Sequence, residues 1–179
     1  AVNKTLMGTA NGAWVSSYKP FGTTDLEIGY DPKSKFAAQL KMKPWYEVVS
    51  EPGFRLGRTD PATDPKGVLA VKALEGAAAK YKVAALKTLA TETSDVFPET
   101  DLVGRVQLGE LDAGFFYAVE AVAAKIPTVP LTGFKLFATY TVAVVNRSPH
   151  PSAAASFATF LEGPTARAIL GKDGMSTSS

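Results

Sequence analysis

The chain has 179 residues, of which 46% are hydrophobic and 20% are charged, and its formal net charge is +2. This length allows one domain or two small lobes with a buried core. The scattered charges argue against the basic stripe of a nucleic-acid-binding protein. Without cysteine, and with His150 as the one histidine in a predicted surface turn, thiolate metal sites and Ser–His catalysis are not expected. No run of about twenty apolar residues is present, so no membrane insertion is predicted.

Gly, Ser and Thr dominate residues 1–24, which predicts an irregular N-terminal arm packed by Trp14 and Tyr18. After it, strand and helix patterns alternate. They predict strands at 26–30, 54–56, 113–117 and 136–145, an extended segment at 126–131, and helices at 36–40, 45–49, 66–81, 83–91, 102–108, 119–125, 152–161 and 165–170. This alternation predicts an α/β fold with a mostly parallel sheet. Residues 175–179 read as a disordered tail.

The segment Gly57–Gly67 is the most informative stretch. It holds two Thr-Asp-Pro units between a short apolar strand and a long Ala-rich helix. A polar loop that leads from a strand into a helix N-terminus can hold an anion, because unpaired N–H groups and the positive end of the helix dipole meet there. The same pattern also fits a plain helix start, with Asp64 as N-cap and Pro65 as first helical residue.

Each charged residue of this segment has two interpretations. Asp60 belongs to a ligand site or only forms a turn before Pro61. Arg58 neutralises an anion or is a solvated surface charge, and Lys66 contacts an anion or faces solvent. A carboxylate beside a dianion is repulsive unless a metal or a proton intervenes, which argues against Asp64 as a simple anion contact.

Tyr117 and Asp101 are two further candidate residues for the ligand site. Tyr117 ends a buried strand, where α/β sheets place ligands, although a core tyrosine with its hydroxyl at the rim fits equally. Asp101 is predicted to be the N-cap of the helix that starts at Leu102.

Four stretches in this order resemble the molybdate/tungstate-binding proteins of ABC importers. They are Leu26–Phe36 with Tyr-Asp-Pro-Lys-Ser-Lys, Gly57–Gly67 with Gly-Arg-Thr-Asp-Pro and Asp-Pro-Lys-Gly, Gly109–Tyr117 with Gly-Glu-Leu-Asp-Ala-Gly-Phe-Phe-Tyr, and Tyr140–Val145 with the helices of 151–174. The resemblance covers roughly residues 25–174. It implies a periplasmic-binding-protein-like fold of type II, with two lobes that close on a tetrahedral oxyanion. Residues 25–117 would form the inserted ligand-binding lobe, and residues 118–174 the return segment and C-terminal helices of the first lobe.

The resemblance also implies which groups meet the ligand. They are Asp60, Asp64, Pro65, Lys66 and Gly67 from the loop, the helix N-terminus near Asp101 and Leu102, and the hydroxyl of Tyr117. Archaeal-type members carry a second carboxylate where this sequence has Phe116, so hydrogen bonding to a tetrahedral anion is expected in place of expanded coordination. The family's first strand, serine loop and helix have no convincing counterpart before residue 25, although Ser16 and Ser17 imitate one such loop. Part of the first lobe is therefore expected to be absent.

The expected function is a solute-binding protein that captures molybdate, tungstate or a similar oxyanion and hands it to an ABC transporter permease. The resemblance implies no catalysis, no cofactor and no metal of its own, and a periplasmic or extracellular location, although no signal peptide is visible. Two alternatives stay open. One is a sensor or interaction module that has lost ligand binding. The other is an enzyme in which Asp60 and Asp64 do acid–base or Mg²⁺ chemistry.

Overall fold

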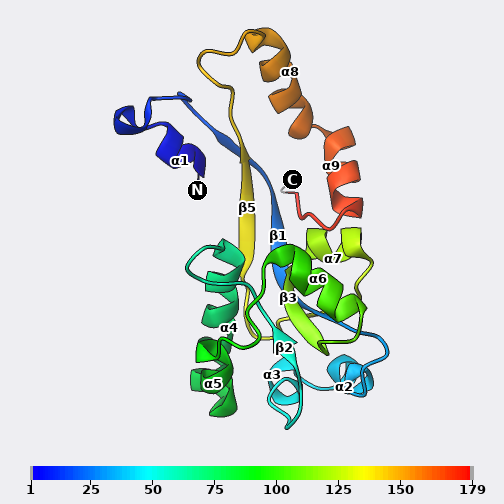
Figure 1. The fold of residues 1–179 in the computed structure, drawn as a ribbon. Helices are drawn as coiled ribbons and strands as arrows, with labels where there is room; N and C mark the ends of the chain where they lie inside the picture. Colours follow the sequence, from blue (N-terminus) through cyan, green and yellow to red (C-terminus); the bar gives the residue numbers. More distant parts are fainter. Residues whose placement is uncertain (1, 178–179) are drawn as a thin grey trace. The chain divides into compact units, whose positions relative to one another are not determined.

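The computed structural model of this chain describes residues 2–177 and carries nearly all of the predicted helices and strands with shifted ends (Figure 1). The elements are α1 (Val2–Leu6), η1 (Thr9–Asn11), β1 (Lys19–Tyr30), α2 (Ala37–Met42), α3 (Trp45–Val48), β2 (Leu56–Gly57), α4 (Pro65–Tyr81), α5 (Ala85–Thr91), α6 (Glu99–Gln107), β3 (Ala113–Tyr117), α7 (Ala118–Ala124), β4 (Thr128–Pro130), β5 (Phe137–Val142), α8 (Pro151–Leu161) and α9 (Pro164–Lys172). Residues 2–24, predicted to be irregular, contain α1, η1 and the first half of β1. Ala1, and Ser178 and Ser179 of the predicted tail, lie outside the described residues.

The sheet is mixed, with strand order β2-β3-β1-β4, and β5 also pairs with β1. β1 runs antiparallel to β3, with Leu26 opposite Tyr117, and antiparallel to β4, with Ile28 opposite Val129. β2 and β3 are parallel and are joined by the crossover through α4, α5 and α6. The prediction of a mostly parallel sheet is therefore wrong at β1. Helical crossovers can be recognised in the sequence, whereas the direction of a strand inserted between β3 and β4 leaves no local signal.

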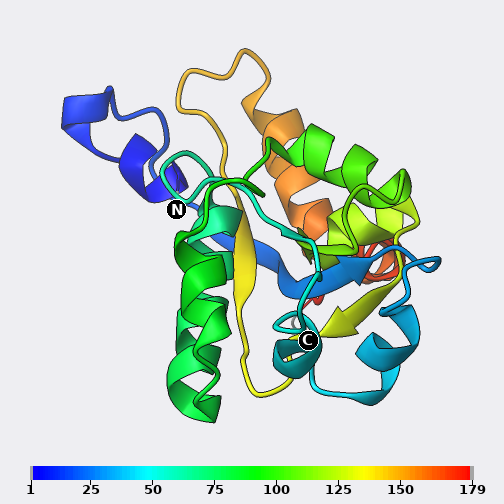
Figure 2. The same cartoon turned by 60° about the horizontal axis from the view of Figure 1, so that its bottom comes forward.

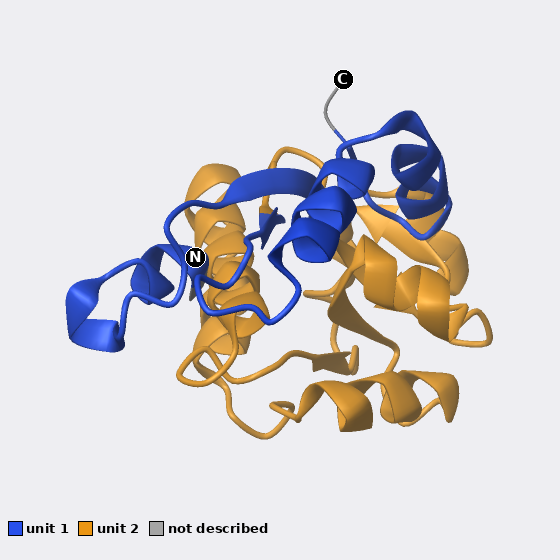
Figure 3. Cartoon of the chain, turned by 90° about the horizontal axis from the view of Figure 1, so that it is seen from above, with its two compact units in different colours: residues 1–24, 138–179 blue, residues 25–137 orange. Residues whose placement is uncertain are grey.

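The chain forms two compact units (Figure 3). Unit 1 comprises residues 1–24 and 138–179, and unit 2 comprises residues 25–137. The resemblance implies a lobe boundary after Tyr117, and the second boundary between the two compact units lies after Phe137. The reason is that α7 packs against β3 and β4 pairs with β1, so the segment after Tyr117 stays in unit 2.

Unit 2 has a dense core. Figures 1 and 2 show α4 and α5 side by side. The buried face of α4 is built from small residues with one leucine, namely Ala70, Ala73, Leu74, Ala77 and Ala78. Val68 of the same helix is exposed. Trp45 is fully buried, and its ring meets the rings of Phe115 and Phe134 edge-on at centroid distances of 6.2 and 6.3 Å.

Unit 1 is built differently. β5 and β1 pair, Val15 bridges Val145, and Ser176 bridges Thr23, so the described part of the predicted tail is held against β1. α8 has no buried residue although it is strongly apolar. Phe157 of this helix is 58% exposed. Along residues 2–177, the helices are too short or too polar for any of them to cross a lipid bilayer.

Candidate functional site

A pocket of about 340 Å³ opens at the Gly57–Gly67 loop of unit 2. Its lining consists of Thr59, Asp60, Thr63, Asp64, Val96, Phe97 and Pro98. Thr59 is only 2% exposed, and its Oγ1 atom is buried without a hydrogen-bond partner. A buried hydroxyl that bonds to nothing costs free energy, so such a group at the wall of a pocket points to a bound species that supplies the missing partner. The sequence gives no reason to single out Thr59 among the threonines of the loop.

The N-terminus of α4 adjoins this pocket. Asp64 is its N-cap, since the Oδ1 atom accepts the backbone N–H of Lys66 at 2.8 Å, and Pro65 is the first helical residue. Both predictions are confirmed. α4 is 17 residues long, so its first turn carries the positive end of a full helix dipole.

Asp60 shapes the loop. Its Oδ1 atom accepts the N–H of Ala62 at 2.9 Å, and its carbonyl oxygen accepts the N–H of Asp64 at 2.8 Å. The turn-forming interpretation is confirmed, and a contact of Asp60 with a ligand stays a prediction. The loop lies directly on the helix start, because a Cβ atom at Gly67 would fall 2.5 Å from the carbonyl oxygen of Thr59. Only glycine allows that approach.

Arg58 is buried, so the surface-charge interpretation is wrong. Its guanidinium donates to the carbonyl oxygens of Ala90 at 3.0 Å, Glu92 at 2.8 Å and Thr59 at 3.3 Å. These bonds satisfy carbonyl groups at the end of α5 and tie that end to the loop. Burial lowers the pKa of Arg58, and the nearby charge of Asp60 partly opposes the shift.

Lys66 is 1% exposed, so the solvent-facing interpretation is wrong as well. Its Nζ atom lies 2.6 Å from Oε2 of Glu120 and 3.8 Å from Oε2 of Glu99. It also lies 5.7 and 5.8 Å from the ring centres of Phe116 and Tyr117. Burial raises the pKa of Glu120, and the hydrogen bond from Lys66 works against that shift.

Glu120 links the start of α4 to the end of β3. The Oε2 atom that meets Lys66 also accepts the backbone N–H of Tyr117 at 3.0 Å. Tyr117 ends β3 and is buried at its edge. One carboxylate oxygen therefore holds the start of α4 and the end of β3 together, while a contact between the Tyr117 hydroxyl and a ligand stays a prediction.

The start of α6, near Asp101 and Leu102, differs from the prediction. α6 begins at Glu99 after Pro98, so Asp101 lies exposed within the first turn and is not the N-cap. The proline starts the helix earlier than the Asp signal suggests. The N–H of Leu102 donates to the carbonyl oxygen of Pro98 at 3.0 Å, and its side chain is buried in a cluster with Phe116. Pro98 lines the pocket, whereas Asp101 and Leu102 do not.

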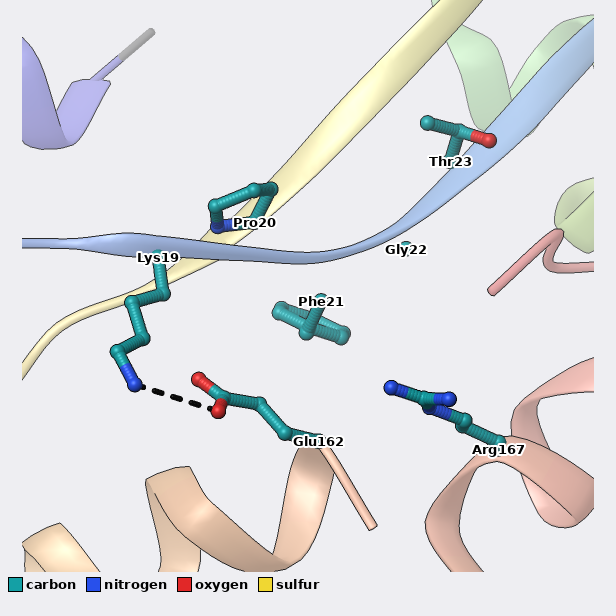
Figure 4. Close-up of a pocket in the computed structure, with 7 residues that line it drawn as sticks. All are labelled: Lys19, Pro20, Phe21, Gly22, Thr23, Glu162 and Arg167. Carbon is teal, nitrogen blue, oxygen red and sulfur yellow. Dashed lines mark hydrogen bonds and ion pairs between the residues drawn. The ribbon is translucent and has the colours of Figure 1, made fainter. Parts of the chain in front are cut away.

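A second pocket, of about 320 Å³, lies in unit 1 (Figure 4). Lys19 and Glu162 form an ion pair of 3.3 Å at its wall, and Arg167 reaches in from α9. Lys19 is 71% exposed, so this pair contributes little to stability. None of the residues predicted to bind a ligand lines this pocket.

The fold is an α/β fold of the periplasmic binding protein type II kind, and it carries a candidate pocket at a helix N-terminus. The chain belongs to the bacterial extracellular solute-binding protein family, which it matches over residues 4–176. The predicted type II binding-protein fold and the predicted relationship to molybdate/tungstate-binding proteins are both confirmed, although the sheet is mixed.

Individual relatives support this assignment. An uncharacterized solute-binding protein of Petrotoga mobilis is 28% identical over 192 residues, covering 88% of this chain and 60% of the relative. The molybdate/tungstate-binding protein of Pyrococcus abyssi is 29% identical over 125 residues, covering 56% of this chain and 36% of the relative. The chain thus spans less than two thirds of the length of these curated relatives.

Solved structures share the fold. The periplasmic molybdate-binding protein of Azotobacter vinelandii has a TM-score of 0.68 at 18% identity, covering 99% of this chain and 73% of that chain. The sulfate-binding protein of Mycobacterium tuberculosis has a TM-score of 0.60 at 18% identity, covering 89% of this chain and 58% of that chain. At such identities the likeness establishes the fold alone.

Proposed function

We propose that this chain captures a tetrahedral oxyanion, with molybdate and tungstate as the first candidates, for delivery to the permease of an ABC importer. The proposal places the protein in the periplasm or outside the cell and gives it no catalytic step. The family assignment supports the binding role, and the names of the molybdate- and tungstate-binding relatives support the ligand class.

One observation carries the proposal: Thr59, whose buried Oγ1 has no partner, lines a pocket that also contains Asp64, the N-cap of α4. A hydroxyl donor and the positive end of a helix dipole suit an oxyanion, since it is negatively charged and accepts hydrogen bonds on every side. The Thr59 hydroxyl would donate to one oxygen of the anion, and the first turn of α4 would stabilise its charge.

Isothermal titration of the 179-residue chain with molybdate, tungstate, sulfate and phosphate tests this proposal. At least one of the four anions is expected to give a saturable heat. Thr59→Val keeps the shape of the side chain and removes the hydroxyl. It is expected to weaken that binding by about ten- to a hundredfold, the usual effect of losing a hydrogen bond to a charged group.

A stability measurement separates a ligand contact from a structural role. Because the Thr59 hydroxyl bonds to nothing in the unliganded protein, Thr59→Val should leave the unfolding free energy unchanged or slightly higher. Thr88→Val, an exposed change on α5, is the matched control and should alter neither property. Absence of heat with all four anions, or full affinity in Thr59→Val, would reject the proposal.

A further inference from the structure

Two tyrosine rings of unit 2 lie face to face, away from the candidate pocket. Tyr46 of α3 and Tyr81, the last residue of α4, have ring centres 3.8 Å apart and ring planes that differ by 8°. Both residues are half-buried. Aromatic pairs usually adopt offset or edge-to-face arrangements with centres about 4.5–7 Å apart. The carbon atoms of the two rings are therefore in van der Waals contact, in an arrangement that the rings alone do not favour.

Neighbouring side chains hold the two rings in this arrangement. The buried Trp45 meets the ring of Tyr46 edge-on, with centres 6.0 Å apart. Phe134 meets the ring of Tyr81 edge-on, with centres 6.3 Å apart. The ammonium group of Lys80 lies 5.2 Å from the centre of the Tyr81 ring. Each ring thus has its own support, and the folded chain brings together two tyrosines that are far apart in the sequence.

Contact between two phenol rings has a chemical consequence when they are oxidised. A phenol that gives one electron to an oxidant also loses its hydroxyl proton and becomes a neutral phenoxyl radical. The unpaired electron is shared between the oxygen and the ring carbons ortho to it, Cε1 and Cε2. Desolvation and the nearby phenol of Tyr81 raise the pKa of Tyr46, so this hydroxyl keeps its proton at neutral pH until the ring is oxidised.

We propose that Tyr46 and Tyr81 form an oxidative cross-linking site, at which a one-electron oxidant joins the two rings as dityrosine. Each ring loses one electron to the oxidant and one hydroxyl proton to solvent. One bond then forms between a Cε atom of Tyr46 and a Cε atom of Tyr81. The hydrogen on each of these carbons moves to the phenolic oxygen of its own ring, which restores both aromatic systems. The product has lost two hydrogen atoms, and the oxidant has gained two electrons.

Burial distinguishes this pair from the other tyrosines of unit 2. Tyr30 is 3% exposed and Tyr117 is 8% exposed, so an oxidant in solvent has little access to either. Tyr46 and Tyr81 are half-buried and already in contact, so their radicals can couple before they meet another molecule. Neither tyrosine of the pair lines the pocket at the Gly57–Gly67 loop, and the cross-linking site is therefore independent of the proposed ligand binding.

Photo-oxidation of the 179-residue chain with tris(bipyridine)ruthenium(II) and persulfate tests the proposal, because the Ru(III) ion that light generates removes single electrons from tyrosine. A low protein concentration keeps links between molecules rare. The expected product is a monomer with dityrosine fluorescence and a mass lower by two hydrogens. Mass spectrometry of a protease digest should find the peptides of Tyr46 and Tyr81 joined. Illumination continues until the exposed Tyr140 is oxidised, and unlinked Tyr46 and Tyr81 at that point would overturn the proposal.

Phenylalanine variants locate the bond. Tyr46→Phe and Tyr81→Phe keep a ring for the stack but cannot form a phenoxyl radical, so each should fold normally and lose the fluorescence of the monomer. Tyr18→Phe is the matched control, because Tyr18 is a half-buried tyrosine outside the pair, and it should leave the yield unchanged. Monomer fluorescence that persisted in both Tyr46→Phe and Tyr81→Phe would place the bond elsewhere and reject the site.

Oxidation in urea separates the folded geometry from the mere presence of tyrosines. In the unfolded chain all six tyrosines are accessible, and links should spread over many pairs. The yield of the link between Tyr46 and Tyr81 should therefore fall severalfold when the chain is unfolded before illumination. Equal yields of this link from the folded and the unfolded chain would show that the stack does not direct the reaction, and the proposal would fail.

Discussion

The two units of this chain bury their apolar side chains very differently. In unit 2, Trp45, Phe115 and Leu74 are fully enclosed, and the helices present alanine faces that pack closely. In unit 1, the apolar helix α8 has no buried residue, and Phe157 and Phe160 stack on each other with their rings largely open. The candidate ligand pocket belongs to the unit with the dense core, where a loop can be held rigidly enough to recognise an anion.

This difference indicates that the stabilising contacts lie mainly in unit 2 and that an apolar surface open to association lies in unit 1. Burial of a large apolar side chain stabilises a fold by about 1.5–3 kcal/mol, so unit 2 holds most of the stabilising contacts. The apolar surface of α8 and α9 contributes little by itself. Exposed Phe157, Phe160 and Ile169 belong to a kind of surface that proteins normally cover.

The largest contrast is expected from one substitution made in each unit. Phe115→Ala removes a fully buried ring and should lower the free energy of unfolding by about 3–5 kcal/mol through lost transfer energy and a new cavity. Phe157→Ala removes an exposed ring and should change it by about 0.5 kcal/mol or less. Urea denaturation followed by circular dichroism measures both. Equal losses would contradict the contrast between the units.

Breaking an ion pair should also cost more unfolding free energy in unit 2 than in unit 1, although the difference should be smaller than for the two phenylalanines. Lys66→Met leaves Glu120 buried and unpaired, which should cost about 3 kcal/mol, whereas the double change Lys66→Met/Glu120→Gln should recover part of that loss. Lys19→Met breaks the exposed pair with Glu162 in unit 1 and should cost under about 1 kcal/mol. Thermal melts at low and high salt provide the measurement. A salt-sensitive loss at Lys19 that exceeded the loss at Lys66 would refute this order.

Two glycines test backbone packing. Gly67→Ala brings a Cβ atom against the backbone of Thr59, Asp60 and Pro61, so it should destabilise unit 2 by about 1–3 kcal/mol and distort the pocket loop. Gly171→Ala in α9 meets open space within a helix and should stabilise by about 0.5 kcal/mol. Urea denaturation of both variants measures the change in unfolding free energy. An unchanged unfolding free energy in Gly67→Ala would show that the loop does not pack directly on the start of α4.

The smallest expected effect concerns acid stability. Burial would raise the pKa of Asp112, but hydrogen bonds from Arg55 and Ser34 outweigh it and hold the pKa below its ordinary 3.8. Because the folded-state pKa is depressed, the contribution is fully present above pH 3.8 and is lost as the pH falls through the folded value. Melting temperatures recorded from pH 5 to pH 2 should therefore drop more steeply in the parent than in Asp112→Asn. If the melting temperatures of the parent and of Asp112→Asn fell equally with pH, Asp112 would not contribute to the loss of stability in acid.

Much of the fold can be predicted from the sequence because its signals are local. The cap Asp64, the proline Pro65 and the apolar periodicity place α4 to within one residue at each end. The direction of β1 has no such signal. The end of unit 2 is also hidden, because it depends on the pairing of β4 with β1, which is a contact between segments about one hundred residues apart.

A candidate pocket lies at the loop that the sequence singles out, whereas the surroundings of the charged side chains of this loop differ from the prediction. The loop can be found because two Thr-Asp-Pro units precede a helix. The burial of Lys66 and Arg58 cannot be predicted from the sequence, because long cationic side chains are usually solvated. Only tertiary packing brings Glu120 to Lys66 and the carbonyl groups to Arg58. Thr59 is missed for a similar reason, since an unsatisfied hydroxyl can be recognised only once its surroundings are known.

Amide hydrogen exchange with and without saturating molybdate or sulfate tests the central claim most directly. The claim is that an oxyanion binds at the Gly57–Gly67 loop and the N-terminus of α4. Exchange should therefore slow in peptides that cover residues 59–68 and stay unchanged in α8 and α9. Unchanged exchange in the loop under conditions where calorimetry shows binding, or protection confined to unit 1, would contradict the account.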